Sequence, residues 1–248
     1  MSDILITDDG PVRTIRINRP DKKNALTLPM YDAMSDAIGH CHIDKSIRSL
    51  IIAGQPDVFC AGNDIGDFMA MAERGALGQP IVRFLHVLAR NEVPVVAAVN
   101  GNAVGVGCTM LMHCDQVILG ANARLATPFV GLGLVPEAAS SLLAPRLMGP
   151  ARAFALLVMG QPLNAAEAKE AGLANAVVDP AETEAAALSA ARKIAALPVQ
   201  AVLASRRLIR GPVEEIIGRI DDEAEAFKLR LQSPEARAAF AAFLARKK

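Results

Sequence analysis

Short apolar strands that alternate with helical segments constrain the fold of this chain most. Ser49–Ala53, Pro94–Val99 and Asp115–Gly120 are rich in Val, Ile, Leu and Ala, have the length of buried strands, and each ends next to a glycine or an Asn-Gly pair. Helical patterns lie between the first two, at Gly66–Ala72 and Pro80–Arg90. Strand–helix alternation favours right-handed β–α–β units, so the sequence predicts an α/β fold.

The two ends of the chain differ from this middle part. Ile4–Thr7 and Val12–Asn18 flank Asp-Asp-Gly-Pro and predict a β-hairpin. From Pro180 onward the sequence is alanine-rich and helical, and no strand pattern recurs. We therefore predict a core over residues 1–180 and a C-terminal helical region over residues 181–248.

Three further helices are predicted within the core. Val104–His113 has few strand-forming residues at its start and reads as a helix opened by glycines. Pro136–Leu147 and Ala151–Met159 also have helical character, with Gly149-Pro150 as a break between them. Leu173–Val178 is then expected to return as a strand.

Composition excludes several classes of protein. The chain has 248 residues, is 52% apolar and carries a formal net charge of +0, which suits one sizeable core and disfavours a nucleic-acid binder. No apolar run approaches the roughly 20 residues of a membrane span, and the acidic start Met-Ser-Asp is unlike a signal peptide. The cysteines lack metal-site spacing and suit a reducing compartment, so we expect a cytoplasmic protein. They are Cys41, Cys60, Cys108 and Cys114.

No cofactor or metal site is predicted. Two Gly-x-Gly pairs lack the third glycine of a dinucleotide loop, since Met110 and Pro136 occupy its place, and no phosphate-binding P-loop occurs. Ser140 and Ser141 lack the Gly-x-Ser-x-Gly setting of a nucleophile. We therefore expect chemistry that needs neither a bound cofactor nor a serine nucleophile.

Glu137 is the one ionisable side chain between Arg124 and Arg146, and its neighbours are apolar or small. Such a carboxyl group must be exposed, neutral, hydrogen-bonded or functional. Two glycine-bearing turns upstream, Phe59–Asp64 and Gly101–Gly107, can present bare backbone N–H groups. Alternatively, the turns serve only as a helix cap and as a close packing site. A carboxylate beside backbone donors can move a proton next to a carbonyl group.

Several segments together resemble the crotonase (enoyl-CoA hydratase/isomerase) superfamily. They are Ile17–Leu26, Phe59–Ile65, Pro94–Cys108 and Leu163–Leu173, and their order and spacing match over roughly two thirds of the chain. The resemblance implies the crotonase (ClpP-like) spiral of β–β–α units, followed by a helical region that builds trimers, which often pair into hexamers. It also implies an acyl-CoA thioester substrate, with CoA as part of the substrate.

The same resemblance assigns residues to roles. The N–H groups of Ala61 and Val106 match an oxyanion hole, and Glu137 matches a catalytic base. Lys22, Lys23 and Ala25 would lie near the CoA portion, with Lys23 as a partner for phosphate. The implied substrate contacts are Lys22, Lys23, Ala25, Ala61, Gly62, Asn63, Asp64, Ile65, Val106, Phe129 and Leu132.

Two departures from the hydratases favour an isomerase. Hydratases of this superfamily activate water with two glutamates, and this chain has Thr109 and Phe129 at the matching positions. The segment from Pro128 to Ser141 is instead similar to the 3,2-enoyl-CoA isomerases of the peroxisomal and bacterial type, in which the glutamate matched by Glu137 is the base. The resemblance thus implies an isomerase of fatty acid metabolism that moves a double bond from C3 to C2.

Other functions stay open at this stage. Hydration with unusual residues, which would make the enzyme a lyase, and thioester hydrolysis are alternatives, as is a catalytically silent acyl-CoA-binding homologue. The ionisation of Glu137 is also open, because an apolar pocket raises the pKa of a carboxyl group whereas a helix N-terminus after Pro136 lowers it.

Overall fold

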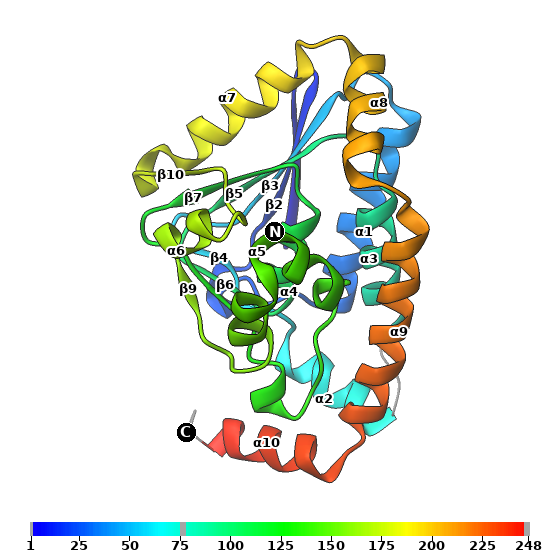
Figure 1. The fold of residues 1–248 in the computed structure, drawn as a ribbon, viewed down its shortest axis with the longest axis vertical. Helices are drawn as coiled ribbons and strands as arrows, with labels where there is room; N and C mark the ends of the chain where they lie inside the picture. The colour runs from blue at the N-terminus through cyan, green and yellow to red at the C-terminus, as the bar shows by residue number, and fades with distance from the viewer. Residues whose placement is uncertain (1, 75–77, 246–248) are drawn as a thin grey trace.

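The computed structural model describes residues 2–74 and 78–245 and contains two β-sheets (Figure 1). The larger, six-stranded sheet has the order β1-β2-β3-β5-β7-β10. β1 pairs antiparallel with β2, and the other neighbours pair parallel. The predicted hairpin and α/β fold are therefore confirmed. These strands are β1 Ile4–Asp9, β2 Val12–Ile17, β3 Ser49–Ala53, β5 Val95–Val99, β7 Gln116–Gly120 and β10 Ala176–Val178.

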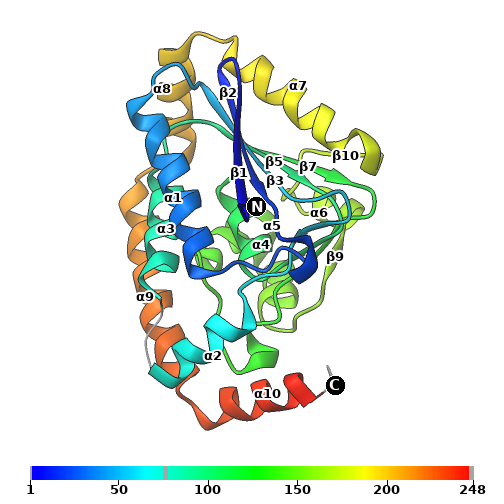
Figure 2. The same ribbon diagram turned by 180° about the vertical axis from the view of Figure 1, so that it is seen from behind.

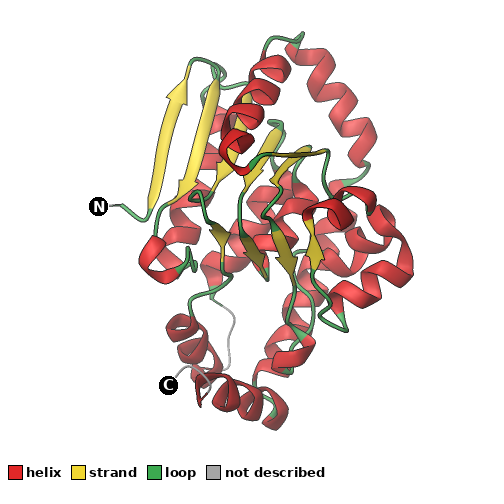
Figure 3. Cartoon of the chain, turned by 90° about the vertical axis from the view of Figure 1, so that its left-hand side faces the viewer, coloured by secondary structure: helices red, strands yellow, loops and turns green. Residues whose placement is uncertain are grey.

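The smaller, four-stranded sheet has the order β4-β6-β8-β9 and lies below the first (Figure 3). After β3, β5 and β7 the chain turns and forms β4, β6 and β8 respectively, and this repeat is the β–β–α spiral that the sequence implied. The sequence did not predict these short strands, because two or three residues carry no readable alternation. They are β4 Val58–Cys60, β6 Asn102–Val104, β8 Arg124–Ala126 and β9 Leu163–Asn164.

Helices cover both faces of the larger sheet. α1 packs on α3, and α3 packs on α9, with the rings of Tyr31 and Phe84 at a centroid distance of 5.4 Å between α1 and α3. The helices of the core are α1 Leu28–Ile43, α2 Ile65–Arg74, α3 Gln79–Arg90, α4 Val106–Thr109, α5 Ser140–Leu157 and α6 Ala165–Glu170. Short 3-10 turns are η1 Pro20–Lys22, η2 Met110–His113, η3 Val130–Leu132 and η4 Pro180–Glu182.

The C-terminal part is helical, as predicted, and wraps around the core. α7 lays Ala187, Ala191 and Ala195 on the sheet, and these small residues allow a close approach. α8 and α9 run along the side formed by α1 and α3, and α10 closes the end next to α2 and η3 (Figures 1 and 2). The helices are α7 Thr183–Ala195, α8 Val199–Arg210, α9 Val213–Leu231 and α10 Pro234–Ala245.

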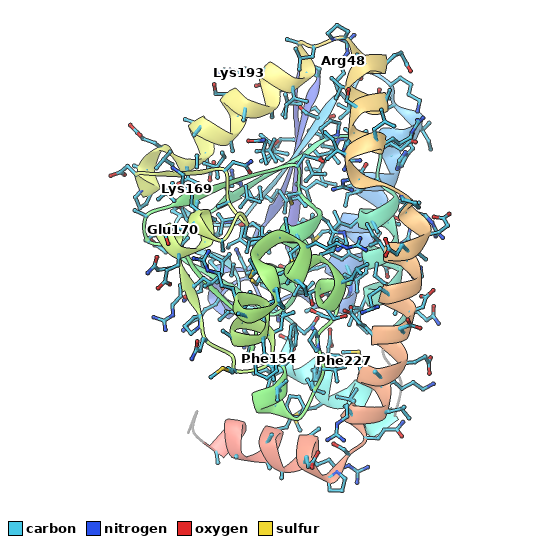
Figure 4. All side chains as sticks on the ribbon, in the orientation of Figure 1. Arg48, Phe154, Lys169, Glu170, Lys193 and Phe227 are labelled. Atoms are coloured by element: carbon cyan, nitrogen blue, oxygen red, sulfur yellow. The ribbon has the colours of Figure 1, made fainter. Side chains whose placement is uncertain are left out.

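The apolar side of α9 anchors this region. Phe227 points from α9 toward α2 (Figure 4), and its ring centroid lies 5.8 Å from that of Phe68. Ile220 and Leu231 are buried in the same core. In the described part of the chain, no single helix is long and apolar enough to cross a membrane, and Pro180–Ala195 together with Val199–Arg210 meets that test only across a bend of 108°.

Three predicted boundaries were wrong. α5 begins at Ser140 and not at Pro136, because Ala138 and Ala139 have φ of 62° and 55°, which no right-handed helix contains. The predicted break at Gly149-Pro150 is confirmed, because Gly149 has the non-helical φ of 77° and ψ of 160°, and the second helical stretch ends at Leu157. Val104 ends a strand instead of opening a helix, and the last core strand, β10, begins only at Ala176, since local pattern does not fix such ends.

Candidate active site

The two glycine turns follow β4 and β6, which pair in parallel, so the turns lie side by side. A Cβ atom on Gly107 would lie 2.8 Å from the carbonyl oxygen of Cys60, and one on Gly62 would lie 3.1 Å from that of Val104. Gly105 adopts φ 57° and ψ −122°, a conformation that a side chain disfavours. The glycines therefore bring the two turns into backbone contact.

Val106 is the first residue of α4, so its N–H group has no acceptor within the helix. The N–H groups of Cys108 and Thr109 both donate to the carbonyl oxygen of Gly105, which fixes the direction of this first turn. Among the described residues, none accepts a hydrogen bond from the Val106 N–H. Its position suits the oxyanion donor predicted from the sequence.

The other predicted donor, Ala61, is not free. Its N–H donates to the carbonyl oxygen of Lys23 at 3.1 Å. Leu26 donates to the oxygen of Gly62 and accepts from the N–H of Asp64, both at 2.8 Å, so successive residues of this turn face alternate sides. The N–H of Asn63 therefore points away from Leu26, and within the described residues it meets no acceptor. Asn63 replaces Ala61 as the first candidate donor.

Glu137 is buried, with 6% of its surface exposed, and its Oε1 has no hydrogen-bond partner in the described structure. Side chains from elsewhere in the fold bind the two residues that follow Glu137. His113 donates from Nε2 to the carbonyl oxygen of Ala138 at 2.7 Å, since a carbonyl group can only accept. Glu223 accepts from the N–H of Ala139 at 2.6 Å.

Burial raises the pKa of Glu137 to about 8, and the charge of Glu223 adds to this rise. The helix N-terminus does not reverse the effect, because α5 begins three residues later than Glu137 and the dipole acts mainly within the first turn. The charge of Glu137 also contributes to the raised pKa values of Tyr31 and Cys60, after burial in both cases. The carboxyl group therefore lies near the first glycine turn.

The residues predicted to lie near CoA belong to the segment that leads into Leu26, which pairs with the first glycine turn. Lys22 and Lys23 are exposed, while Ala25 is half-buried. Asn24 is fully buried and donates from Nδ2 to the carbonyl oxygens of Val58 and Phe59, both at 3.1 Å. The sequence did not single out Asn24 as the residue that attaches the lysine turn to β4.

Asp64 caps α2. Its Oδ1 accepts from the N–H of Gly66 at 2.9 Å, and its Oδ2 pairs with Arg19 at 2.7 Å. This supports the cap over a contact with substrate. Ile65, half-buried, is the first residue of α2.

Phe129 and Thr109, which the resemblance matched to the glutamates of hydratases, are both buried. A Cβ atom on Gly105 would lie 3.9 Å from the Phe129 ring, so this ring lies beside the second glycine turn. Leu132 is half-buried in η3. In the described ranges, Glu137 and Glu223 are the two buried acidic side chains. Within the described residues, the site thus offers one carboxyl group whose Oε1 has no hydrogen-bond donor, and positions 109 and 129 supply no second carboxyl group.

Tyr31 and Glu223 belong to the site but were not predicted. The Tyr31 hydroxyl donates to Oδ1 of Asn63 at 2.5 Å and so holds the donor residue. Glu223 lies three residues after Ile220 and four before Phe227, so it is on the same apolar face of α9 as both. A carboxylate on the apolar side of a helix was a readable signal.

A pocket of about 740 Å³ lies elsewhere, between α8 and the core. Its walls include Leu143, Leu147, Leu197 and Ile209, and none of the predicted site residues lines it. In the described part of the chain, no group of three or more His, Cys, Asp or Glu side chains could hold a metal ion.

Comparison with known proteins agrees with this geometry. The family profile described as enoyl-CoA hydratase/isomerase matches residues 8–248. The chain is 34% identical to the short-chain-enoyl-CoA hydratase of Clostridium acetobutylicum, over 100% of this chain and 97% of that protein. It is 33% identical to enoyl-CoA delta isomerase 2 of Rattus norvegicus, over 98% of this chain and 64% of the rat protein.

Solved structures show the same fold. The structure of Pseudomonas aeruginosa OdaA has a TM-score of 0.93 and 42% identity, and the match covers 98% of this chain and 99% of that one. An enoyl-CoA hydratase/isomerase from Pseudoalteromonas atlantica T6c also has a TM-score of 0.93, with 39% identity over 99% and 98% of the two chains. The spiral of paired sheets, the glycine turns and these matches together show that this chain is an enzyme of the enoyl-CoA hydratase/isomerase family, with the crotonase fold.

Proposed function

We propose that this enzyme is a 3,2-enoyl-CoA isomerase in which Glu137 is the single base. One observation carries the proposal. A buried carboxyl group with an unpartnered Oε1 lies near a turn with a free backbone N–H, while Thr109 and Phe129 replace the two acids that water activation needs. Isomerisation adds no water, so one base is enough.

In this mechanism the thioester oxygen accepts hydrogen bonds from the N–H groups of Asn63 and Val106. Glu137 removes a proton from C2, and the C–H electron pair forms a dienolate whose charge rests on the thioester oxygen. The protonated Glu137 then returns the same proton to C4. The double bond moves from C3–C4 to C2–C3, and no atom is gained or lost.

The site favours this step in two ways. Each backbone donor aimed at the developing oxyanion is typically worth about 3–4 kcal/mol of barrier. A pKa of Glu137 near 8 makes its carboxylate a stronger base than an ordinary one, although a smaller fraction is ionised at pH 7. Burial thus lowers the fraction of enzyme molecules in which Glu137 is ionised, but it makes each ionised Glu137 a stronger base.

Glu137→Gln tests the proposal, with Glu170→Gln as the matched control. Glu170 is exposed at the end of α6, at the periphery of the molecule (Figure 4). We expect Glu137→Gln to lower kcat for a 3-enoyl-CoA by at least about 100-fold, the usual worth of a general base, while CoA-ester binding and folding persist. The control should match the parent enzyme. Undiminished turnover in Glu137→Gln would rule out Glu137 as the base.

Hydration is the second candidate, because relatives such as the Clostridium acetobutylicum protein are named as hydratases. Offering 2-enoyl-CoA and 3-enoyl-CoA separately distinguishes the two. We expect the double-bond shift of 3-enoyl-CoA to exceed water addition to 2-enoyl-CoA. Faster hydration would reverse the assignment, and binding of both esters without turnover would indicate a silent homologue.

The lysine turn suggests how the CoA part of the substrate binds. Exposed Lys22 and Lys23 can pair with CoA phosphates, and no separate cofactor is needed.

The surface of α8 suggests that copies of the chain associate. Leu208 and Ile209 on α8 are 85% and 84% exposed, and α8 buries no residue. We therefore propose a homotrimer or a dimer of trimers, which light scattering of the purified protein would test.

A further inference from the structure

Glu223 is a buried carboxyl group that the proposed chemistry does not use directly. It lies on α9, with 6% of its surface exposed. Its Oε2 accepts from the N–H of Ala139 at 2.6 Å, and its Oε1 accepts from the N–H of Ser141 at 2.9 Å. Both donors follow Glu137 within four residues of the chain, although Glu223 is more than 80 residues away. The C-terminal region is therefore hydrogen-bonded to the segment that follows Glu137.

This turn has an unfavourable backbone conformation. Ala138 and Ala139 have φ of 62° and 55°, and a left-handed conformation costs a non-glycine residue of order 1–3 kcal/mol. Such residues persist only where their surroundings hold them. Two hydrogen bonds to Glu223 and one from His113 to Ala138 supply that hold. Without Glu223, the amides of Ala139 and Ser141 would lose their acceptors.

Four titratable side chains surround Glu137 or the turn that carries it. Glu223 approaches from α9, Tyr31 from α1 and Cys60 from β4, while His113 lies behind the turn. Burial lowers the pKa of His113 to about 4, so its ring is neutral near pH 7, and burial raises the pKa of Tyr31 and Cys60, which keeps them neutral. Glu223 is thus the charged group that acts on the base.

Glu223 retains its charge more readily than Glu137. Burial raises its pKa, but the hydrogen bonds from Ser141 and Ala139 and the charge of Arg219 oppose that rise. Arg219 lies one turn earlier on α9 and donates to Oγ of Ser141 at 3.2 Å. By contrast, Oε1 of Glu137 has no hydrogen-bond partner in the part of the chain that the structure describes. Because hydrogen-bond donors favour a charged carboxylate, the negative charge of the pair resides mainly on Glu223.

We propose that Glu223 is a positioning residue of the isomerase, which fixes the direction of the Glu137 side chain by binding the amides of Ala139 and Ser141. The inference rests on the proposed function. The negative charge of Glu223 also makes Glu137 a stronger base.

Glu223→Gln tests this inference. A glutamine side chain has the same shape but offers one acceptor in place of two and carries no charge. We expect kcat for a 3-enoyl-CoA to fall 10- to 100-fold with KM changed by less than about threefold. The acid limb of the pH profile of kcat/KM should move to lower pH. Glu225→Gln, on the exposed side of the same helix, is the control and should change neither.

Glu223→Asp separates position from charge. Aspartate keeps the charge and is one methylene shorter, so kcat should fall while the acid limb stays near that of the parent enzyme. Equal acid limbs in the Gln and Asp variants would overturn the electrostatic part. Unchanged kcat in a folded Glu223→Gln or Glu223→Asp variant would overturn the positioning role.

A stability cycle gives a readout that needs no turnover. It compares the parent protein, Glu137→Gln, Glu223→Gln and the double variant by urea unfolding at pH 8.5, where Glu137 is largely charged. We expect non-additive effects, because the charge of Glu223 acts on the carboxyl group of Glu137. Additive effects would overturn this electrostatic coupling. If the parent enzyme failed to isomerise 3-enoyl-CoA, the proposed function would fail, and the cycle would still decide whether Glu223 acts on Glu137.

Discussion

Replacement of Glu137 by Gln should stabilise the folded enzyme increasingly as pH rises. The pKa of this carboxyl group is 4.5 in its ordinary state and about 8 in the fold. Between these values the folded state binds a proton that the unfolded state has released. The contribution of Glu137 to stability is therefore fully present below about pH 4.5 and is lost as pH rises to about 8.

The size of this effect follows from the same two values. Each pH unit between them changes the free energy of unfolding by about 1.4 kcal/mol. From pH 5.5 to pH 7.5 the parent enzyme should lose about 3 kcal/mol relative to Glu137→Gln, because the glutamine does not titrate. Most of the full difference, about 5 kcal/mol, should be reached by about pH 8.

Urea unfolding followed by circular dichroism measures the difference at a series of pH values. Protein concentration must be the same throughout, since association of copies also stabilises the fold. Subtracting the two proteins at each pH removes the titration of all groups that they share. A difference that does not change between pH 5.5 and pH 7.5 would refute the reasoning, because Glu137 would then titrate as an ordinary exposed carboxyl group.

Three substitutions test other parts of the structure. Gly105→Ala should cost about 1–3 kcal/mol in urea unfolding and lower kcat, because φ of 57° with ψ of −122° disfavours a side chain, although the added Cβ atom would reach only ordinary contact distance, 3.9 Å, from Gly62 and Phe129. Gly218→Ala, within α9 and in open space, should instead raise the free energy of unfolding by about 0.5–1 kcal/mol. Tyr31→Phe removes the donor to Asn63 and should cost about 1–3 kcal/mol, with a fall in kcat larger than the change in KM. A stabilised Gly105→Ala, a destabilised Gly218→Ala or an unchanged Tyr31→Phe would each contradict these contacts.

The sequence predicted the strands of the larger sheet well, because each carries its own apolar pattern. Ser49–Ala53 matches β3 residue for residue. β4, β6, β8 and β9 have two or three residues each, so only their partners define them. Local sequence therefore predicted the frame of the fold but not its second sheet.

The site was predicted in part for a similar reason. Glu137 was readable because a lone carboxyl group among apolar residues is unusual. The left-handed Ala138 and Ala139 were not readable, because alanine favours a helix and the contact that holds this turn comes from Glu223 on α9. The resemblance matched Ala61 to an oxyanion donor, whereas the Lys23 carbonyl group that accepts from its N–H appears only in three dimensions.

Transfer of deuterium within the substrate tests the central claim most directly. A 3-enoyl-CoA that carries deuterium at C2 is converted in ordinary water, and the product is examined by mass spectrometry and NMR. If buried Glu137 alone moves the proton, a measurable share of the deuterium should appear at C4 of the product. Complete loss of that deuterium to solvent from the first turnovers would contradict a single buried carrier.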